Sequence, residues 1–567
     1  MTNPFPTSPS RSGFTAGDTL LPLCLFLVMS ILIVLPYFWL GAASGHDFEF
    51  HAPSWLDVAY QWKQGVWFPR WTAWTNHGFG EPRFIFYPPL SWLLGAALTV
   101  LVPDTAVPVV YIVLVQTLAG LSAYLLLRRL TTRRAAILGA AFYVVNPNTF
   151  LLSYIRSDFA EQLACAFLPL LFLAALRVCD QVDESPSPRP AASVASFSLW
   201  FAIIWLCNAP AAVIATYSVC LLLAWAAVSQ RSIRIIARGA AALLLGFGLA
   251  AFYIIPAAYE QRWVNIGQAL ASGLLPSQNF LFTSIADVEH TWFNWIASIC
   301  TLSVILLLLL AALLSRRFSA GSISGRRAAL SFLIVGATAI FLTLRWSEPL
   351  WGILPKLRFV QFPWRWISVL ALLAAYFLAL LVERRRGWVW FAAVLILTVP
   401  LAQFLAANTW WDPDEMSVQR DAIDSGHGFD GTDEYDPVGD DHLDLPADAP
   451  LAKALPHDSA NEPGPSVEIR VGYWTTERKV IRVKATSAAR IALRALNYPA
   501  WRVELDGRPI RPERMDDVNQ MVVPVNAGDS EIIVLFTRTP DRKIGNAASA
   551  FSAAALLLLI WRKKKGA

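Results

Sequence analysis

Charged side chains are scarce in this chain of 567 residues, at 15%, whereas apolar types make up 56% and the mean hydropathy is +0.47. This composition excludes an ordinary soluble protein and predicts one that crosses a membrane many times. The net charge of +5 says little, because basic clusters separate the apolar runs while the longest polar segment is acidic. Nothing in this pattern indicates a nucleic-acid partner.

Cysteine is also sparse. The six cysteines all lie in or beside apolar segments, and the polar parts of the chain have none. A disulfide framework and a CxxC metal site are therefore excluded, and we expect the cysteines to act as small core residues. The N-terminus lacks a small-residue cleavage site before its first long apolar run, which predicts a retained first helix rather than a removed signal peptide.

Long apolar runs dominate the rest of the chain. A membrane span needs about 20 apolar residues. The expected spans are 19–41, 107–128, 134–152, 161–178, 192–208, 210–228, 236–256, 293–315, 328–345, 364–382, 387–407 and 544–562. The run 90–102 is left out because, at ~1.5 Å per residue, it would extend only about 20 Å into a hydrocarbon core about 30 Å thick. We expect it to form a short juxtamembrane helix within an outer loop over 42–106.

The basic clusters decide the orientation. With these twelve spans and the N-terminus inside, the strongest clusters all face the cytoplasm, as the positive-inside rule requires. They are 128–134, 230–238, 315–327, 383–386 and 562–565. Counting 90–102 as a span would move every one of them outside. The loop 179–191 supports this topology least, because its acids balance a single arginine. Both termini are thus expected in the cytoplasm, with all seven histidines on the outer face.

The first outer loop concentrates groups that can do chemistry. His46, Asp47, Glu49 and His51 lie within six residues, directly after the first span. The tryptophans that follow are Trp55, Trp62, Trp67, Trp71 and Trp74. Carboxylates, imidazoles and apolar rings at a membrane surface indicate a sugar-handling site, with rings such as Trp71 offering a face to a sugar. Positioning at the membrane interface alone also explains tryptophans there.

A metal site is a second interpretation of the same loop. His46, Asp47, Glu49 and His51 are of the types that bind a divalent cation. Four groups within six residues of one loop rarely all converge on one ion. No cofactor is therefore firmly implied, and a divalent cation remains an open alternative.

A second polar group follows the third span. Arg156, Asp158 and Glu161 lie at the outer boundary, where the fourth span begins. Charged residues at such depth usually face a cavity or one another. They are expected either to form the second wall of the site opened by Asp47 or to make an interfacial Arg156–Glu161 ion pair that anchors the helix.

Several arginines are also expected on the outer face, against the positive-inside trend, and they need an anionic partner. Lys356, Arg358 and Arg365 lie at the entrance of the tenth span among aromatic residues, and Arg262 lies at the start of another outer loop. A guanidinium binds phosphate through paired, charge-assisted hydrogen bonds. These cations therefore predict contacts with a lipid phosphate headgroup, and structural pairs with nearby acids are the alternative.

The end of the chain changes composition twice. Residues 408–465 carry fifteen acids against two basic residues, which predicts an extracytoplasmic linker. The stretch GFDGTDEYDP (428–437) is denser in acids than a linker requires, and is expected to fold back over the site or to hold a cation. Residues 466–542 then alternate with period two, which predicts a small antiparallel β-sandwich. The final span and basic tail occupy 543–567, and the main transmembrane domain 1–407.

Several motifs, in their order along the chain, resemble one family. They are FYPPL, the arginine–acid pair after the third span, LRFVQFPWRW, GTDEYDP and NYPAWRVELDGRPI. Over nearly the whole chain they are similar to bacterial membrane proteins labelled 6-pyruvoyl-tetrahydropterin synthase related, a branch of the GT-C class of membrane glycosyltransferases. The pterin label itself finds no counterpart, because no soluble pterin-type metal and catalytic domain is visible.

This resemblance implies a mostly α-helical, GT-C-like protein of the bacterial inner membrane, working in the lipid bilayer at its outer face. The implied reaction is transfer of a sugar from a polyprenyl-phosphate donor, with inversion, to a glycan, lipid or protein acceptor. An aspartate after the first span is the catalytic base in this class, which implies that role for Asp47. This chain departs from the DE pair of several such enzymes, so Glu49 stays a second candidate, and Asp158 is an implied nearby acid.

The expected mechanism needs one base, because a phosphate leaves without strong acid assistance. Asp47 would accept the proton of the acceptor hydroxyl. Arg365, with Arg358 or Arg262, would stabilise the departing phosphate, while Asp158 and Glu161 orient the acceptor or the base. His46, His51 and Arg156 are expected to contact substrate.

Two other functions fit the same spans. A transporter or flippase of lipid-linked saccharides would carry its key polar residues near the bilayer midplane, whereas the span interiors here are almost free of charge. A non-catalytic assembly protein would use the β-sandwich as a binding module. That last function predicts that Asp47 can be lost without consequence.

Overall fold

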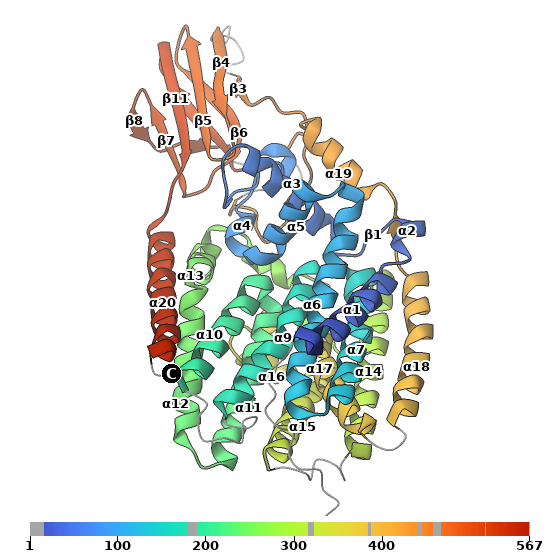
Figure 1. Cartoon of the computed structure of the whole chain (residues 1–567). Helices are drawn as coiled ribbons and strands as arrows, with labels where there is room; N and C mark the ends of the chain where they lie inside the picture. Colours follow the sequence, from blue (N-terminus) through green and yellow to red (C-terminus); the bar gives the residue numbers. More distant parts are fainter. Residues whose placement is uncertain are drawn as a thin grey trace, which may run out of the picture.

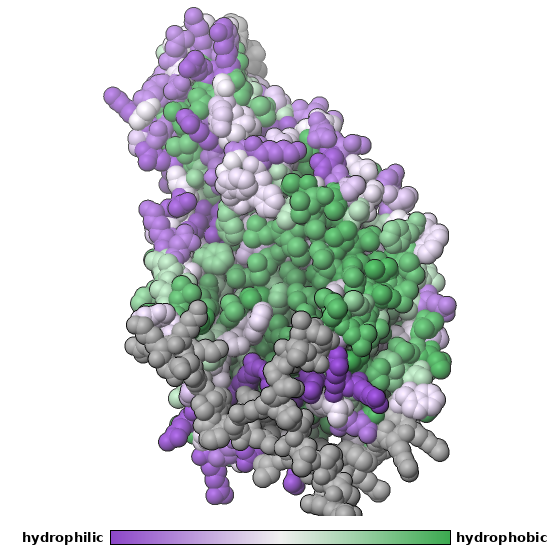
Figure 2. All heavy atoms as spheres, viewed as in Figure 1, coloured by the Kyte–Doolittle hydropathy of each residue, from purple (hydrophilic) through white to green (hydrophobic). Residues whose placement is uncertain are grey.

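A bundle of long apolar helices forms the body of the protein, and a small β-domain stands at one end of it (Figure 1). The computed structural model describes residues 16–179, 190–315, 323–383, 387–439, 445–456, 466–515 and 518–565. Apolar side chains cover the middle of the bundle, while polar ones gather over the β-domain and at the opposite end (Figure 2). A hydrophobic middle between two polar ends is the surface that a membrane-spanning protein requires.

Ten described helices or helix runs are long and apolar enough to cross a membrane. They are Thr19–Leu40 (with α1, Ala16–Ile33, and α2, Tyr37–Leu40), Asp104–Leu130 (with α6, Val107–Leu130), Arg133–Arg156 (with α7, Arg133–Val144, and α8, Pro147–Phe150), α9 (Phe159–Val178), α10 (Pro190–Cys207), α11 (Ala209–Ser229), α14 (Val288–Ser315), Gly325–Thr343 (within α15, Ile323–Thr343), Pro363–Val382 (with α17, Ile367–Val382) and Pro540–Trp561 (within α20, Pro540–Lys565). Ten of the twelve predicted spans are confirmed. Of the other two, 387–407 is helix α18 (Gly387–Ala407). Its apolar part, Phe391–Ala407, is shorter than the ten spanning helices.

The remaining predicted span, 236–256, is broken. It consists of α12 (Ile233–Leu249) and α13 (Ala251–Glu260), and the run bends by 74° between them. The break leaves backbone groups without helical partners, and Ser549 of α20 satisfies them. Its hydroxyl accepts from the Phe252 N–H at 2.9 Å and lies within donating distance, 3.0 Å, of the carbonyls of Gly248 and Leu249. A neighbouring helix thus supplies the hydrogen bonds that lipid cannot.

The first loop folds into helices between the bundle and the β-domain (Figure 1). They are α3 (Phe48–Lys63), the short α4 (Arg83–Phe86) and α5 (Pro89–Leu101). Helix α5 corresponds to the predicted juxtamembrane helix 90–102, and it is among the described apolar helices too short to cross a membrane. Strand β1 (Ala42–Ala43) pairs with β2 (Trp411–Asp412), so the start of this loop is tied to the segment that follows α18.

The β-domain (strands β3 to β11, residues 452–536) is a sandwich of two antiparallel sheets, as predicted. One has the order β3-β6-β10-β9 and the other β4-β5-β11-β7-β8. The strands are β3 (Ala452–Ala454), β4 (Val467–Trp474), β5 (Arg478–Ala485), β6 (Ala489–Leu496), β7 (Trp501–Leu505), β8 (Arg508–Ile510), β9 (Glu513–Arg514), β10 (Gln520–Val525) and β11 (Gly528–Phe536). In β5, residues alternate between buried and exposed, which is the period-two pattern expected of a half-buried strand.

A buried ion pair joins the β-domain and the last helix to the broken span. Arg542 of α20 donates to both carboxylate oxygens of Glu260, at 2.7 and 2.8 Å, and Tyr498 donates to the same carboxylate at 2.6 Å. Glu260 is fully buried at the end of α13. Two-point pairing of this kind fixes the relative position of the two helices, and α13 forms one wall of the cavity described below.

We expect Arg542→Gln to lower the free energy of unfolding by about 3–5 kcal/mol, because it leaves Glu260 buried without its cation. The measurement is chemical or thermal unfolding of the purified protein in detergent. The double variant Glu260→Gln/Arg542→Gln removes both charges and should recover most of that loss. Equal losses in the single and double variants would show that the ion pair does not set stability here.

Candidate active site

A break in the backbone positions the site. The chain leaves its third membrane run through a π-helical turn, Leu151–Arg156, and Ser157 then adopts a left-handed conformation with φ of 52°. Asp158 follows and caps α9, since its side chain accepts from the Glu161 N–H at 2.8 Å. The distorted turn and the reversal bring Arg156, Asp158 and Glu161 to one place at the end of α9.

The first loop docks onto this break. The Asp47 N–H donates to the Arg156 carbonyl at 2.8 Å, and Ser157 donates its hydroxyl to the Ala43 carbonyl at 2.6 Å. Gly45 allows the contact, because a Cβ at this position would lie 2.5 Å from the Ile155 carbonyl oxygen. The close approach of two backbones is what places Asp47, the residue before α3, beside Arg156.

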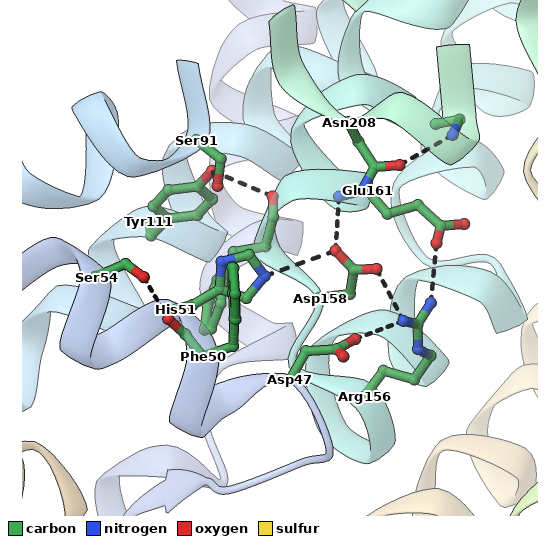
Figure 3. Close-up of polar contacts among 12 residues, drawn as sticks. Asp47, Phe50, His51, Ser54, Ser91, Tyr111, Arg156, Asp158, Glu161 and Asn208 are labelled. Atoms are coloured by element: carbon green, nitrogen blue, oxygen red, sulfur yellow. Dashed lines mark hydrogen bonds and ion pairs between the residues drawn. The ribbon is translucent and has the colours of Figure 1, made fainter. Parts of the chain in front are cut away.

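Arg156 is the centre of a cluster of charges (Figure 3). Its Nη2 lies 2.5 Å from Oδ2 of Asp47 and 3.0 Å from Oδ2 of Asp158. Its Nη1 donates to Oε2 of Glu161 at 2.9 Å. One guanidinium therefore holds three carboxylates from two segments that are far apart in the sequence.

Arg365 adds a second cation to the cluster. It lies in the turn Pro363–Trp366, which leads into α17, and its Nε is 3.1 Å from Oε2 of Glu161 while its Nη2 is 3.6 Å from Oδ2 of Asp158. The same guanidinium donates to the Val360 carbonyl at 3.0 Å. Because both acids are buried next to it, Arg365 is an ion-pair partner of Glu161 and Asp158 in this arrangement.

Exposure separates Asp47 from the other acids. The Asp47 side chain is 33% exposed, whereas those of Asp158 and Glu161 are 3% and 1% exposed. Burial by itself raises the pKa of Asp158, but the guanidinium of Arg156, with His51 and Arg365 beside it, outweighs burial and holds that pKa well below its usual range. Asp158 is thus a fixed buried anion, and Asp47 is the acid of this cluster that a substrate can reach.

A cavity of about 870 Å³ opens beside the cluster. Its polar side includes His46, Asp47, Glu49, Arg83, Tyr87, Arg156, Asp158, Lys356, Gln361, Arg365, Gln419 and Glu434. Its apolar side includes Trp205, Val213, Tyr253, Ile254, Ala257 and Phe359. Since α10, α11 and α13 supply most of the apolar side, the cavity is bounded by membrane helices on one side and by polar loops on the other.

The segment 428–437, which we call the strap, folds over this cavity. Phe429, Asp430, Thr432, Glu434 and Tyr435 all line it. The sequence motif GTDEYDP is therefore part of the cavity wall. The position of the strap agrees with the expectation that this segment folds back over the site. The alternative expectation, that it holds a cation, is discussed with the metal ligands below.

A buried pair from the first loop holds the strap in place. Glu81 accepts from the Thr432 N–H at 2.9 Å, and Arg83 donates to Glu81 at 2.6 Å and to the Thr432 hydroxyl at 2.7 Å. Further along, Asn76 donates to Asp436 at 2.7 Å. These contacts make the strap a fixed part of the wall.

The predicted site residues fall into three groups. Lining the cavity are His46, Asp47, Glu49, Arg156, Asp158 and Arg365. Directly behind it are His51, whose Nε2 is 3.7 Å from Asp158, and Glu161.

Glu49 has a raised pKa within this cavity. Partial burial is the main cause, and the negative charges of Glu415 and Asp430 add to it. Carboxylates crowd this side, so Glu49 gains a proton more readily than an isolated glutamate.

Three predicted residues lie away from the cavity. Trp71 is buried against Trp501 and Tyr498 of the β-domain, with ring centroids 5.4 and 5.5 Å apart, so its faces are not open to a sugar. Arg262 stacks on Tyr259 at 3.9 Å, and Arg358 is exposed beside Phe359. Ring contacts with local aromatics account for the positions of both arginines.

The sequence analysis missed Arg83, Glu81, Tyr87 and Gln419. Arg83 and Glu81 lie in GEPRF, where Glu81 precedes the short helix α4 and Arg83 begins it, and both are buried. Buried charges in a loop are the signal that could have identified them, but burial is not visible in a sequence. Gln419 comes from α19 (Glu415–Asp424), in the segment expected to be linker.

Metal ligands do not converge in the part of the chain that the structure describes. No group of three or more His, Cys, Asp or Glu side chains is arranged there to hold an ion. His46 stacks near Phe293, with centroids 4.3 Å apart, whereas His51 is buried next to Asp158. The two imidazoles have different surroundings, which leaves the metal interpretation of the first loop without support.

One family profile matches the chain. It is described as "6-pyruvoyl-tetrahydropterin synthase related domain; membrane protein" and matches residues 84–411. No curated protein matches the sequence. The matched range runs from α4 to strand β2, so it includes Arg156, Asp158, Glu161 and Arg365, the apolar wall and most of the bundle, but not Asp47.

Solved structures give distant similarities. ArnT from Cupriavidus metallidurans, bound to undecaprenyl phosphate, is 12% identical, with a TM-score of 0.46 over 73% of this chain and 70% of that chain. The oligosaccharyltransferase AglB from Archaeoglobus fulgidus, in complex with an inhibitory peptide and a dolichol phosphate, is 12% identical, with a TM-score of 0.43 over 69% and 56%. Arabinofuranosyltransferase AftD from mycobacteria is 16% identical, with a TM-score of 0.43 over 70% and 28%. This chain spans just over half of AglB and about a quarter of AftD. Similarities at these TM-scores say nothing about the function of this chain.

We expect Arg156→Gln to lower the free energy of unfolding by about 3–5 kcal/mol, because it leaves two buried carboxylates short of a cation. Asp47→Asn should lower it by about 1 kcal/mol or less, since Asp47 is partly exposed and its loss strands no buried anion. Unfolding of the purified variants in detergent measures both. Equal stability of Arg156→Gln and wild type would contradict the central place given to Arg156.

Proposed function

The chain belongs to the 6-pyruvoyl-tetrahydropterin synthase related family of membrane proteins, and we propose that it is a membrane glycosyltransferase. The proposed donor is a sugar on a polyprenyl phosphate, and the proposed acceptor is a hydroxyl of an envelope glycan, lipid or protein. The observation that carries the proposal is the position of Asp47: it is partly exposed, is held by Arg156, and lies at a cavity with one polar and one apolar side.

The apolar side suits a lipid-linked donor. Trp205, Val213 and Ile254 come from α10, α11 and α13, so this wall is continuous with the membrane-facing bundle. A polyprenyl chain lying along these helices would keep its phosphate at the level where the polar side begins. Lipid-linked substrates need this combination of an apolar path and a polar end.

Lys356 is the proposed phosphate partner. The arginines that line the cavity are paired with carboxylates: Arg83 of the first loop with Glu81, and Arg156 and Arg365 with the buried acids. Lys356 lines the same cavity and is exposed; its ammonium lies 3.5 Å from Gln261 and 4.9 Å from the centre of the Phe359 ring, and it has no ion pair among the described residues. An ammonium without a carboxylate partner is the cation most ready to bind a phosphate. This assignment replaces the sequence-based preference for Arg365.

In the proposed reaction Asp47 acts as the general base. Its carboxylate takes the proton of the acceptor hydroxyl while the acceptor oxygen bonds to the anomeric carbon. The bond from that carbon to the phosphate oxygen breaks, and the lipid phosphate leaves with the electron pair, stabilised by Lys356. Attack opposite the leaving group inverts the anomeric carbon. Arg156 positions Asp47 without touching the substrate.

The polar side of the cavity is the proposed acceptor site. The strap brings Asp430 and Thr432 to the cavity that Glu49 and Gln419 also line, so hydrogen-bonding groups surround the approach to Asp47. Carboxylate, amide and hydroxyl groups are suited to the hydroxyls of a saccharide. We place this side outside the cytoplasm, as the distribution of basic clusters predicts.

The test compares Asp47→Asn with Glu49→Gln in a strain that lacks the protein. Mass spectrometry of envelope lipids and glycans should show one sugar-sized mass missing from that strain. Wild type and Glu49→Gln should restore it, whereas Asp47→Asn should lower transfer by about 10²–10⁴-fold, the usual contribution of a general base. Amounts of protein in the membrane, measured by immunoblot, must be equal.

Full restoration by Asp47→Asn would remove Asp47 as the base and leave transport or assembly of lipid-linked saccharides as the explanation. Loss with Glu49→Gln but not with Asp47→Asn would move the base to Glu49.

A further inference from the structure

A second cavity, of about 590 Å³, lies where the β-domain meets the bundle. Its walls come from the first loop, the start of α13, the β4–β5 turn and the start of α20. The residues are Gly65, Val66, Trp67, Phe68, Arg70, Phe252, Glu477, Phe536, Thr537, Arg538, Arg542 and Asn546. It shares no lining residue with the cavity beside Asp47.

Two arginines in this cavity have no carboxylate partner among the described residues. Arg70 donates to the Phe252 carbonyl at 3.2 Å, and its guanidinium lies over the Phe68 ring at 4.6 Å. Arg538 is exposed and has no ion pair among those residues. Arg542, by contrast, is committed to Glu260. Arg70 and Arg538 therefore retain guanidinium donors for a ligand.

Burial and neighbouring charges of both signs act on Arg70. Burial, and next the charge of Arg542, lower the pKa of Arg70 to about 10, which means that this site disfavours an added positive charge. Glu260, Glu477 and Asp541 act in the opposite sense on the same group. Charges of both signs therefore surround Arg70, and the cavity is not a simple anion site.

The single carboxylate of the lining is also unpaired. Glu477 lies in the turn between β4 and β5 and makes no ion pair among the described residues. Burial raises its pKa, and nearby Arg542, Arg538 and Arg70 lower it. A half-buried carboxylate and two arginines that line one cavity without an ion pair offer places for a positive and a negative group.

The cavity lies at the level where the last helix begins its apolar run. Arg538 comes two residues before α20, and Ile544, in the second turn of that helix, is 60% exposed. Trp67, which lines the cavity from the first loop, is 73% exposed. Exposed tryptophan beside an apolar helix face is typical of the boundary between lipid tails and headgroups. A ligand here can have its polar part in the cavity and its apolar part along α20.

We propose that this cavity binds the headgroup of an aminophospholipid, that is, a phosphate diester that carries a primary ammonium. The phosphate binds Arg70 and Arg538, and the ammonium donates to Glu477. A choline headgroup has no N–H to donate, and a glycerol headgroup has no cation, so neither matches all three side chains. The bound lipid joins the first loop, the β-domain and α20, and it is independent of the proposed transferase reaction.

The experiment uses the full chain in nanodiscs of phosphatidylcholine with increasing phosphatidylethanolamine or phosphatidylglycerol, and counts bound lipids by native mass spectrometry. Wild type should retain phosphatidylethanolamine about tenfold more strongly than phosphatidylglycerol. Glu477→Gln should remove this preference, and Arg70→Gln/Arg538→Gln should weaken retention of both lipids. Arg345→Gln, at an exposed arginine 3.9 Å from Glu348, is the control and should behave as wild type.

Equal retention of the three lipids by wild type would overturn the proposal, as would the same loss in Arg345→Gln. A separate arm titrates free phosphoethanolamine into detergent-purified protein. Stabilisation by the free ester that depends on Glu477 and Arg70, without retention of the lipid, would assign the site to a soluble ligand and also overturn it. Far-UV circular dichroism of each variant confirms that the helices and the β-domain are folded.

Discussion

The arrangement around Arg156 depends on one electrostatic constraint: carboxylates buried at the end of a membrane helix need a cation that is buried with them. Asp158 and Glu161 are almost fully buried, and Arg156 supplies the charge that both require. Because the same guanidinium also reaches Asp47, the first loop is held against the end of α9. The buried acids therefore fix the arginine, and the arginine fixes the partly exposed aspartate at the cavity.

The parts of the chain that surround this cluster come from distant segments, and each is attached by its own buried contact. Glu81 and Arg83 hold the strap, and Glu260 with Arg542 holds α13 to the last helix. The cavity wall thus includes parts of the bundle, the first loop and the acidic segment. The β-domain contributes by its contact with the end of α13. A protein with this connectivity places its most reachable polar groups at one end of the bundle and leaves the opposite side of the cavity apolar.

The sequence was most informative where one physical period decides the structure. Apolar length identified ten spans, and alternation identified the β-sandwich, because burial in lipid or between two sheets imposes those patterns directly. It was less informative where tertiary contacts decide. The bend at Ala250 depends on hydrogen bonds with Ser549, which accepts from the Phe252 N–H, and the contact of Arg156 with Asp47 depends on a π-helical turn and on Gly45. Trp71 serves the β-domain, and Arg365 serves the buried acids, for the same reason: their partners are remote in the chain.

The central claim is that Asp47, positioned by its contact with Arg156, faces a lipid phosphate bound by Lys356. The most direct test is an electron cryomicroscopy structure of the protein in nanodiscs with an added polyprenyl phosphate. The account predicts phosphate density within hydrogen-bonding distance of the Lys356 ammonium, with the polyprenyl chain along α10, α11 and α13. It also predicts that the direct Asp47–Arg156 contact is retained when the phosphate is bound. Phosphate bound outside this cavity, or bound directly to Arg156 with Asp47 displaced, would contradict it.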